Sequence, residues 1–276
     1  MYRSIFDIGC FTIIKTEEER CVNIVFFGTS GGVQSAEDSN VSFLILYQGN
    51  SILVDVSGSP VQSLKKVGIN PLELDCVVIT HEHTDHIYAL PSLIHNLWLM
   101  KREKPLTIIT NTSTERKAKE LCNLFSLLSR EALFPMKWVS IEEGKHVVEP
   151  GVEISLFPVV HSVSTSGLKI STSYSSIVYS SDTSPCEKVG LYAKGAKMLI
   201  HESSGSVGEE NVLNKSGHSS ARQAGEIAER AGVKTLVLCH FDFSKREYST
   251  EQAISEAKSA FRGLIIIPDS FKSYLI

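Results

Sequence analysis

The segment HEHTDH (81–86) carries three histidines and an aspartate, directly after an apolar run, CVVIT. His81 and His83 are two positions apart, so both imidazoles can bind one cation from an extended loop, whereas Asp85 and His86 lie past the turn and can face a second cation. Imidazole nitrogen and carboxylate oxygen are ligands that suit zinc. The motif therefore predicts a metal site rather than a cluster of surface histidines.

Further polar residues follow other apolar runs along the chain. Loops at strand ends are where rigid scaffolds present catalytic groups. A single residue of this kind would be a weak signal, because a lone histidine is more often a hydrogen-bonded structural residue. Their shared placement predicts one site assembled from several strand ends. The residues are His161, Asp182, His201, Glu202 and His240.

A pair of divalent ions held a few ångströms apart has a defined chemical use. Such ions lower the pKa of a shared water from about 15.7 to about 7 and neutralise charge that builds on the attacked centre. The chemistry expected of these residues is therefore hydrolysis.

These motifs together resemble the metallo-β-lactamase superfamily, and the resemblance covers the chain from about Asn23 onward. It implies an α/β fold of the αββα four-layer type, with two facing mixed sheets and helices outside. The chain has no linker-like or low-complexity tract. We therefore expect a single domain over residues 1–276, with 1–20 as an N-terminal extension.

The resemblance also implies a role for each candidate ligand. One zinc is expected at a group of three histidines, a second zinc at a mixed group, and one aspartate is expected to bridge the two ions. The first group is His81, His83 and His161, the second is Asp85, His86 and His240, and the bridge is Asp182.

Asp55, at the end of the run SILVD, matches the aspartate that this family places beneath the metal loop. There it can accept a hydrogen bond from a ligand imidazole and orient it, although an ordinary turn aspartate is the alternative. Oxygen-reducing di-iron members of the superfamily resemble H-x-E-x-D, with a carboxylate where this chain has His83. Hydrolysis is therefore expected in preference to redox chemistry.

Three later segments resemble the ribonuclease Z branch: HESS (201–204), GHSSA (217–221) and CHFDFSKREY (239–248). That branch cleaves phosphodiesters, chiefly at the 3′ side of transfer RNA precursors. The resemblance implies that Glu202 orients His218, which assists the leaving oxygen; the alternative is that His218 caps the following helix. The catalytic residues expected are Asp85, Glu202 and His218.

The chain departs from that branch in two places. Only residues 162–181 separate His161 from Asp182, which is too short for the arm that usually grips transfer RNA, and VSGSPVQ replaces the branch's usual turn after Asp55. A basic segment, WLMKREKP (98–105), either meets substrate phosphates or is a solvated helix end.

We therefore expect a hydrolase with two Zn²⁺ ions per chain, Mn²⁺ or another divalent ion being an alternative. Its substrate is expected to be a phosphodiester, either an RNA 3′ end or a small nucleotide or cyclic diester. An ester, thioester or lactone hydrolase on the same fold is the alternative, and His218 far from the metals would favour it. A non-catalytic metal-stabilised protein is disfavoured, because no ligand of the pattern is missing.

Composition limits the partners. The formal net charge is -4, so no global basic field holds nucleic acid. No apolar run approaches the roughly 20 residues of a membrane span, and the six cysteines show no C-x-x-C spacing. A cytoplasmic protein without a membrane partner is expected, and a homodimer stays open.

The apolar periodicity and turn residues predict alternating strands and helices after an antiparallel start. The helix at 221–231 is the best marked, with a capping box of Ser220 and Gln223 and a terminal Gly232. The other helices are expected at 60–67, 91–101 and 114–128. Strands are expected at 22–27, 42–47, 51–56, 76–80, 106–110, 152–157, 168–172, 176–180, 197–200 and 234–239.

Overall fold

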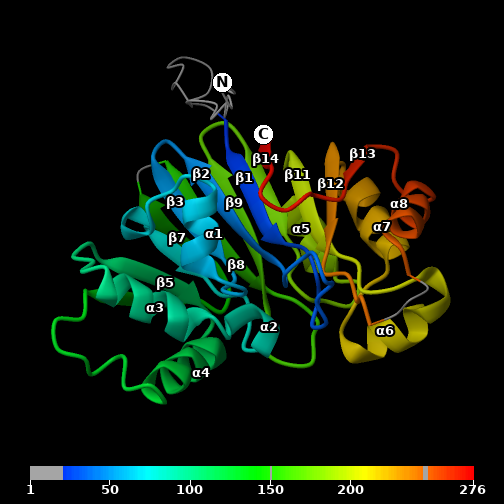
Figure 1. Cartoon of the computed structure of the whole chain (residues 1–276). Coiled ribbons are helices and arrows are strands. Elements are labelled where there is room, and N and C mark those ends of the chain that lie inside the picture. The colour runs from blue at the N-terminus through cyan, green and yellow to red at the C-terminus, as the bar shows by residue number, and fades with distance from the viewer. Residues whose placement is uncertain (1–20, 150, 245–247) are drawn as a thin grey trace, which may run out of the picture.

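The computed structural model describes residues 21–149, 151–244 and 248–276, so the expected N-terminal extension, 1–20, lies outside the described residues. Two seven-stranded sheets face each other in the middle of the molecule, and helices lie on their outer sides (Figure 1). This is the αββα arrangement expected from the sequence, and the expectation is confirmed.

The first sheet has the strand order β14-β1-β2-β3-β4-β5-β6. Its β1, β2 and β3 pair antiparallel, as the turn-rich start of the chain predicted, and β3 to β6 pair in parallel. The strands are β1 (Asn23–Gly28), β2 (Ser42–Tyr47), β3 (Asn50–Val54), β4 (Cys76–Val78), β5 (Leu106–Thr110), β6 (Met136–Ser140) and β14 (Ser273–Leu275).

The second sheet has the order β13-β12-β11-β10-β9-β8-β7. Here β7 to β10 pair antiparallel and β10 to β13 pair in parallel. The strands are β7 (Gly144–Glu149), β8 (Val152–Pro158), β9 (Ser166–Thr172), β10 (Ser176–Tyr179), β11 (Met198–Glu202), β12 (Thr235–Cys239) and β13 (Leu264–Ile266).

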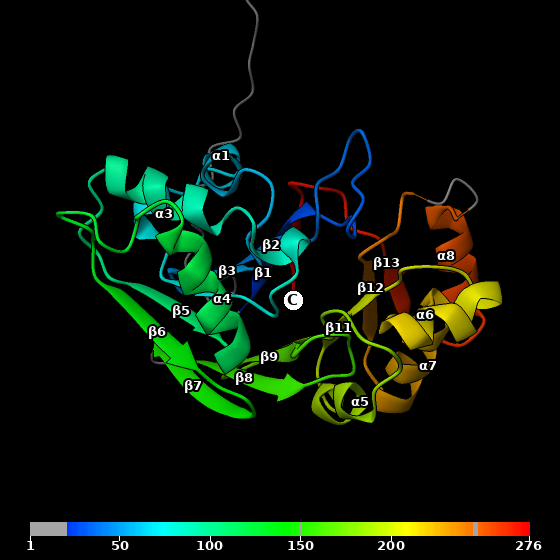
Figure 2. The same cartoon turned by 90° about the horizontal axis from the view of Figure 1, so that it is seen from below.

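The helices form the two outer layers, which Figure 2 shows from below. Helices α1 (Pro60–Lys66), α3 (Leu90–Leu99) and α4 (Thr112–Asn123) pack on the first sheet. Helices α5 (Glu187–Ala193), α7 (Ala221–Ala231) and α8 (Thr250–Lys258) pack on the second. The remaining short helices are α2 (Thr84–Ile87), α6 (Glu210–Ser216) and the 3-10 turns η2 (Pro71–Glu73) and η3 (Val207–Glu209).

Alternation along β1 shows how one strand contributes to two cores. Ile24 and Phe26 point between the sheets, whereas Val25 and Phe27 point toward the helices on the outer face. Both faces of the sheet are buried, so the strand reads as a continuous apolar run rather than an alternating one. In the central layer, Phe43 meets Tyr179 of the opposite sheet edge-on, with ring centroids 5.1 Å apart.

Helix α7 begins and ends where the sequence predicted, with the Ser220–Gln223 capping box and Gly232 in a left-handed conformation. The helix expected at 114–128 is partly wrong, because α4 starts at Thr112 and ends at Asn123. Ser126 has a φ of 51°, which an α-helix does not allow, so the chain leaves the helix axis before that residue. An irregular loop therefore follows α4.

The basic segment at 98–105 serves the fold. Arg102 is only 4% exposed, so neither of its expected roles, phosphate contact or solvated helix end, is correct. Its guanidinium donates to backbone carbonyls of η2 and its C-terminal end and of the turn that follows α3; these carbonyls belong to Pro71, Leu72, Leu74, Lys104 and Pro105. Lys104 forms an ion pair with Asp75 at 2.7 Å. The segment thus fixes the end of α3 to η2.

Arg102→Ala should lower the free energy of unfolding by about 2–4 kcal/mol, because buried carbonyls would lose their donor. Urea unfolding followed by circular dichroism measures the change. The matched control is Lys101→Ala, an exposed neighbour, which should change stability by about 0.5 kcal/mol or less. Equal losses in the two variants would contradict this role for Arg102.

Candidate metal centre

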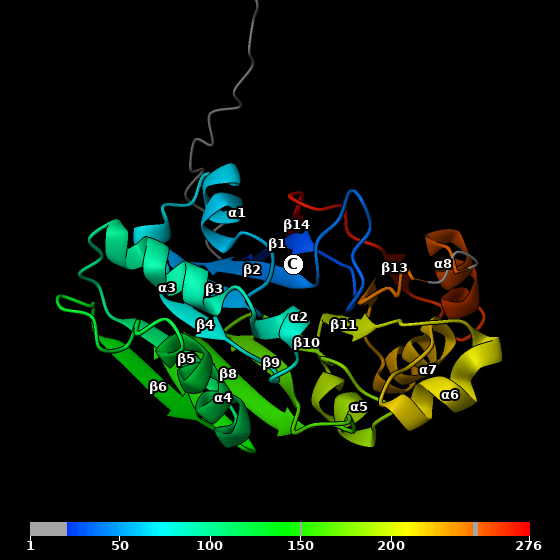
Figure 3. The ribbon, with the colours of Figure 1, turned by 60° about the horizontal axis from the view of Figure 1, so that its bottom comes forward.

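The predicted metal ligands and Glu202 lie at or just beyond strand ends, whereas His218 lies between α6 and α7. HEHTDH runs from the end of β4 into α2, Asp182 follows β10, and His240 follows β12. Figure 3 shows α2 in front of the region where the strands of the second sheet end. The parallel strands of each sheet deliver their carboxyl ends to one edge, which brings residues far apart in sequence together.

Three residues beside the site have left-handed backbone conformations although none is glycine. They are Asp55, Ser181 and His240, with φ values of 55°, 55° and 59°. Each follows a strand directly or after one residue, so the chain turns sharply where the sheet stops. Such conformations are costly and persist where the surroundings hold them, commonly at functional sites.

The described residues contain three groups of side-chain atoms that could hold a metal ion, and within each group the atoms lie within 4.8 Å of one another. The third group is Glu202, His218 and His240, and the other two correspond to the expected ligand sets. The structure thus brings together both sets expected from the sequence, with one aspartate common to them, and ligation itself stays a prediction. The first group is His81, His83, His161 and Asp182, and the second is Asp85, His86, Asp182 and His240.

Hydrogen bonds fix the tautomers of two of these histidines. His161 Nδ1 lies 2.7 Å from the carbonyl oxygen of Gly217, which can only accept, so Nδ1 carries the proton and Nε2 keeps its lone pair. His86 Nδ1 lies 2.7 Å from Asp55 Oδ2 and donates in the same way. The contact predicted for Asp55 is confirmed, and in both histidines Nε2 is the nitrogen that faces the cluster.

His81 and His240 are held through hydroxyl groups. Thr80 Oγ1 lies 3.0 Å from Asp55 and 3.1 Å from His81 Nδ1, so the threonine donates to the carboxylate and accepts from the imidazole. Ser204 Oγ lies 2.7 Å from Glu202 Oε2 and 3.0 Å from His240 Nδ1, so the serine donates to the carboxylate and accepts from the imidazole. Each hydroxyl therefore holds the Nε2 side of a histidine ring toward the cluster.

Three of the atoms that face the centre have no hydrogen-bond partner within the described protein. His86 Nε2, His240 Nε2 and Asp182 Oδ1 are buried without a hydrogen bond. The two imidazole nitrogens approach Asp182 Oδ2 at 3.4 and 3.0 Å without hydrogen-bond alignment. Buried polar atoms left in this way are costly unless something else binds them. Imidazole and carboxylate donors converging around one position fit divalent cations.

The carboxylates also dominate the electrostatics of the cluster. Burial favours the neutral imidazole, but Asp182 and Asp85 outweigh it and raise the pKa of His240 to about 10. Burial likewise opposes ionisation of Asp182, yet His240 and His86 hold its pKa well below the ordinary range. The centre thus needs positive charge, which protons supply and divalent cations can supply in their place.

Glu202 and His218 form a second arrangement beside the metal-ligand groups. His218 Nδ1 lies 3.1 Å from Glu202 Oε1, and the same oxygen accepts from the backbone N–H of Thr183 at 2.6 Å. Burial opposes protonation of His218, but the Glu202 carboxylate outweighs it and raises the pKa of the imidazole. His218 does not cap α7, because Ser220 does.

His218 also lies close to the candidate ligands. Its ring centroid is 4.9 Å from that of His161 and 5.5 Å from that of His240. Gly217 makes this approach possible: its φ is 86°, and a Cβ there would lie 2.5 Å from His161 Nδ1. The glycine of the GHSSA motif therefore lets the two loops meet.

Two results could not be read from the motifs. His201, one of the candidates at a strand end, belongs to neither group, since its Nδ1 donates to the carbonyl of Glu202. Sequence reasoning assigned no role to Ser204 or Thr80, whose hydroxyls orient ligand imidazoles. Their position next to a predicted site residue was the only available signal, because serine and threonine are common at strand ends.

Comparisons with known proteins agree with this geometry. Residues 50–241 match a family model described as Beta-lactamase superfamily domain. Ribonuclease Z of Methanothermobacter thermautotrophicus is 27% identical over 292 residues, covering 87% of this chain and 92% of that protein.

Two solved structures share the fold. The metallo-beta-lactamase fold protein YhfI from Bacillus subtilis has a TM-score of 0.80 at 22% identity and covers 92% of this chain and 99% of its own. The short form of human tRNase Z has a TM-score of 0.75 at 18% identity, covering 91% and 98%. Among the described residues, no helix has the length and apolar character needed to cross a membrane.

Ser204→Ala should weaken binding of divalent metal about 10–100-fold, because His240 would lose the hydroxyl that fixes its tautomer. Competition with a chromophoric chelator measures the affinity. Ser203→Ala is the matched control, since the buried hydroxyl of Ser203 contacts Tyr248 at 2.8 Å instead of the cluster. Unchanged metal affinity in Ser204→Ala would show that the hydrogen bond does not orient a ligand.

Proposed function

The chain belongs to the beta-lactamase superfamily, and we propose that it is a metal-dependent phosphodiesterase of the ribonuclease Z type. The observation that carries the proposal is the position of the Glu202–His218 pair beside two metal-ligand groups. A cation centre can activate water, and a protonated imidazole next to it can assist a poor leaving group.

The proposal includes two Zn²⁺ ions. His81, His83 and His161 would hold one ion, Asp85, His86 and His240 the other, and Asp182 would contact both. When bound, such ions lower the pKa of a coordinated water and offset charge that builds on the phosphate. The donor set suits zinc best, and Mn²⁺ is the alternative.

The residues of the chain supply the remaining steps. Glu202 accepts a hydrogen bond from Nδ1–H of His218, so the imidazolium is held with Nε2–H available to the substrate. As the water oxygen bonds to phosphorus, the water gives up one proton to solvent, the bond from phosphorus to the leaving oxygen breaks, and that oxygen takes the Nε2 proton. Asp85 is 18% exposed and its ionised carboxylate can align the attacking water. Solvent then returns a proton to His218.

The substrate is proposed to be an RNA 3′ end or a small nucleotide diester. Residues 162–181 contain β9 and β10 with short connections, which leaves no room there for a long arm that grips transfer RNA. Location in the cytoplasm is part of the proposal and is supported by the cysteines of the described residues, which form no disulfides with one another and are mostly buried. An ester, thioester or lactone hydrolase on the same fold is the competing function, and proximity of His218 to the cluster argues against it.

Reconstituted protein should contain about two equivalents of zinc per chain, because seven ligands exceed what one tetrahedral ion can use. Elemental analysis after removal of loosely bound metal measures this. Asp182→Ala should reduce both the metal content and the turnover. A firm value of one equivalent, unchanged by added zinc, would contradict a binuclear centre.

His218→Ala should slow hydrolysis of an alkyl phosphodiester about 10²–10⁴-fold, which is roughly 3–5 kcal/mol of barrier. The loss should be far smaller for an aryl diester, because nitrophenolate leaves without a proton. Steady-state kinetics on the two substrates measures the ratio.

Glu202→Gln should show the same selectivity in milder form, because it changes only the orientation and charge of the imidazolium. Metal content must be unchanged in both variants for the comparison to hold. Equal losses on alkyl and aryl diesters, or an emptied metal site, would rule out His218 as the proton donor.

A further inference from the structure

The first metal-ligand group draws its histidines from both sheets. His81 and His83 follow β4 of the first sheet, whereas His161 follows β8 of the second sheet. Pairing within a sheet cannot fix the distance between these imidazoles, because a hydrogen-bonded ladder joins strands of the same sheet only. That distance depends on how the two sheets are joined at this edge.

The side chain of Asn111 lies at this junction. Asn111 directly follows β5, is the N-cap residue of α4 and is 1% exposed. Its Oδ1 accepts from the backbone N–H of Thr114 at 2.9 Å. That bond fixes the orientation of the amide, because a backbone N–H requires an oxygen opposite it. The two N–H donors of Nδ2 therefore lie on the other side of the amide.

The Nδ2 donors of this amide contact both sheets. Nδ2 donates to the carbonyl oxygen of Thr80, the residue that precedes His81, at 3.3 Å. It also donates to the carbonyl oxygen of Ser164 at 3.2 Å and to Oγ of Ser166, the first residue of β9, at 3.3 Å. One amide thus joins the end of β4 to the loop that carries His161.

Two neighbouring contacts strengthen the same junction. The backbone N–H of Ser166 donates to the carbonyl oxygen of Thr80 at 3.0 Å, which is a direct bond between the two sheets. Ser113, in the first turn of α4, donates from Oγ to Glu82 Oε2 at 2.8 Å, and Glu82 belongs to the segment HEHTDH. The start of α4 is therefore attached to the loops on both sides of the first group.

A helix cap alone does not require an asparagine at position 111. Capping needs an oxygen that accepts from the first turn, and serine or aspartate supplies one equally well. The amide nitrogen is the part that a cap does not use. Its two N–H groups would be costly if they were buried without acceptors, and here both have acceptors across the junction.

We propose that Asn111 is a positioning residue for the first metal-ligand group. Its amide sets the distance between His81 and His161 and thereby the affinity for one of the two ions. Asn111 acts through the two loops and not through contact with an ion or a substrate. The proposal rests on the metal centre of the proposed function, but not on the reaction, because it concerns ion binding alone.

Asn111→Ser separates positioning from capping, because serine keeps a capping oxygen and loses the amide nitrogen. Its affinity for Zn²⁺ should fall on the order of tenfold, which is typical when a group that orients a ligand is removed. Competition with a chromophoric chelator measures this. The urea midpoint of its metal-free form should fall less than that of Asn111→Ala, which loses the cap as well.

Asn111→Asp tests the same point with the opposite electrostatic bias. Its added negative charge favours cations, and aspartate also caps α4. Zinc affinity should nevertheless fall, because carboxylate oxygens repel the carbonyl oxygens of Thr80 and Ser164, which the amide nitrogen now joins.

Cobalt provides a readout that a change in stability alone would not move. The visible absorption of bound Co²⁺ depends on the number and arrangement of its ligands. The spectrum of Co²⁺-loaded Asn111→Ser should differ from that of the parent protein, because imidazoles from the two sheets would converge differently.

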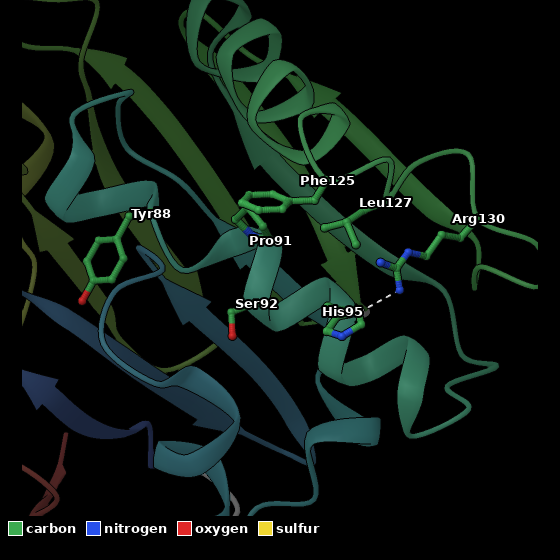
Figure 4. A pocket seen from close by; sticks show the side chains of 7 residues that line it. All are labelled: Tyr88, Pro91, Ser92, His95, Phe125, Leu127 and Arg130. Carbon is green, nitrogen blue, oxygen red and sulfur yellow. Dashed lines mark hydrogen bonds between the residues drawn. The ribbon is translucent and has the colours of Figure 1, made fainter.

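Two variants control for lost stability. Arg102→Ala should lower the urea midpoint without changing zinc affinity. Arg130→Met removes the bond from Arg130 Nη1 to His95 Nδ1 at 2.9 Å, which Figure 4 shows between the loop after α4 and α3. This contact lies beyond the other end of α4, so its loss should leave the zinc affinity and the cobalt spectrum at parental values.

Parental zinc affinity and a parental cobalt spectrum in Asn111→Ser would overturn the proposal. Equal losses of affinity in Asn111→Ser and Arg102→Ala would also overturn it, because the effect would then follow stability. A parent protein that binds two ions but hydrolyses no diester would contradict the proposed function only. The affinities of the variants would still decide the role of Asn111.

Discussion

One buried carboxylate, Asp182, sets the geometry on which the centre depends. Its Oδ2 lies between 3.0 and 3.9 Å from the Nε2 atoms of four imidazoles; these belong to His81, His86, His161 and His240. The carboxylate is 2% exposed, so water screens these interactions little. An isolated carboxylate buried there would be costly in free energy. The surrounding imidazoles offset this cost when they carry protons or bind cations. The three segments that carry these imidazoles must therefore keep their positions relative to this one side chain.

That requirement explains the backbone around the site. Ser181 directly precedes Asp182, and it shares a left-handed conformation with Asp55 and His240. Strain of this kind persists only where neighbouring structure holds it, and here the rigid ends of three strands do so. The surrounding αββα layers are thus a scaffold that compensates for locally unfavourable loops. Their apolar cores, on both faces of each sheet, supply the stability.

The sequence predicted most of this arrangement, for physical reasons that differ between its parts. The candidate ligands of HEHTDH lie within six residues of one another, and α7 has capping residues at both ends. Each feature could therefore be recognised from a short stretch of sequence alone. Short strands such as β6 and β13 were missed because their residues are only partly buried and show no strong periodicity. Arg102 was misread because a buried guanidinium that binds carbonyls has the same local sequence as a solvated one.

Hydrogen-bond roles were the least predictable part of the site, since they depend on contacts between distant segments. Ser204 illustrates this: its hydroxyl contacts both Glu202 and His240, so one group connects the pair proposed to donate a proton with a proposed metal ligand. If His240 holds a metal ion as proposed, one hydroxyl sets both its orientation and that of Glu202. The proposed proton donor and the proposed metal centre therefore share a hydrogen-bonding group and are not fixed independently of each other.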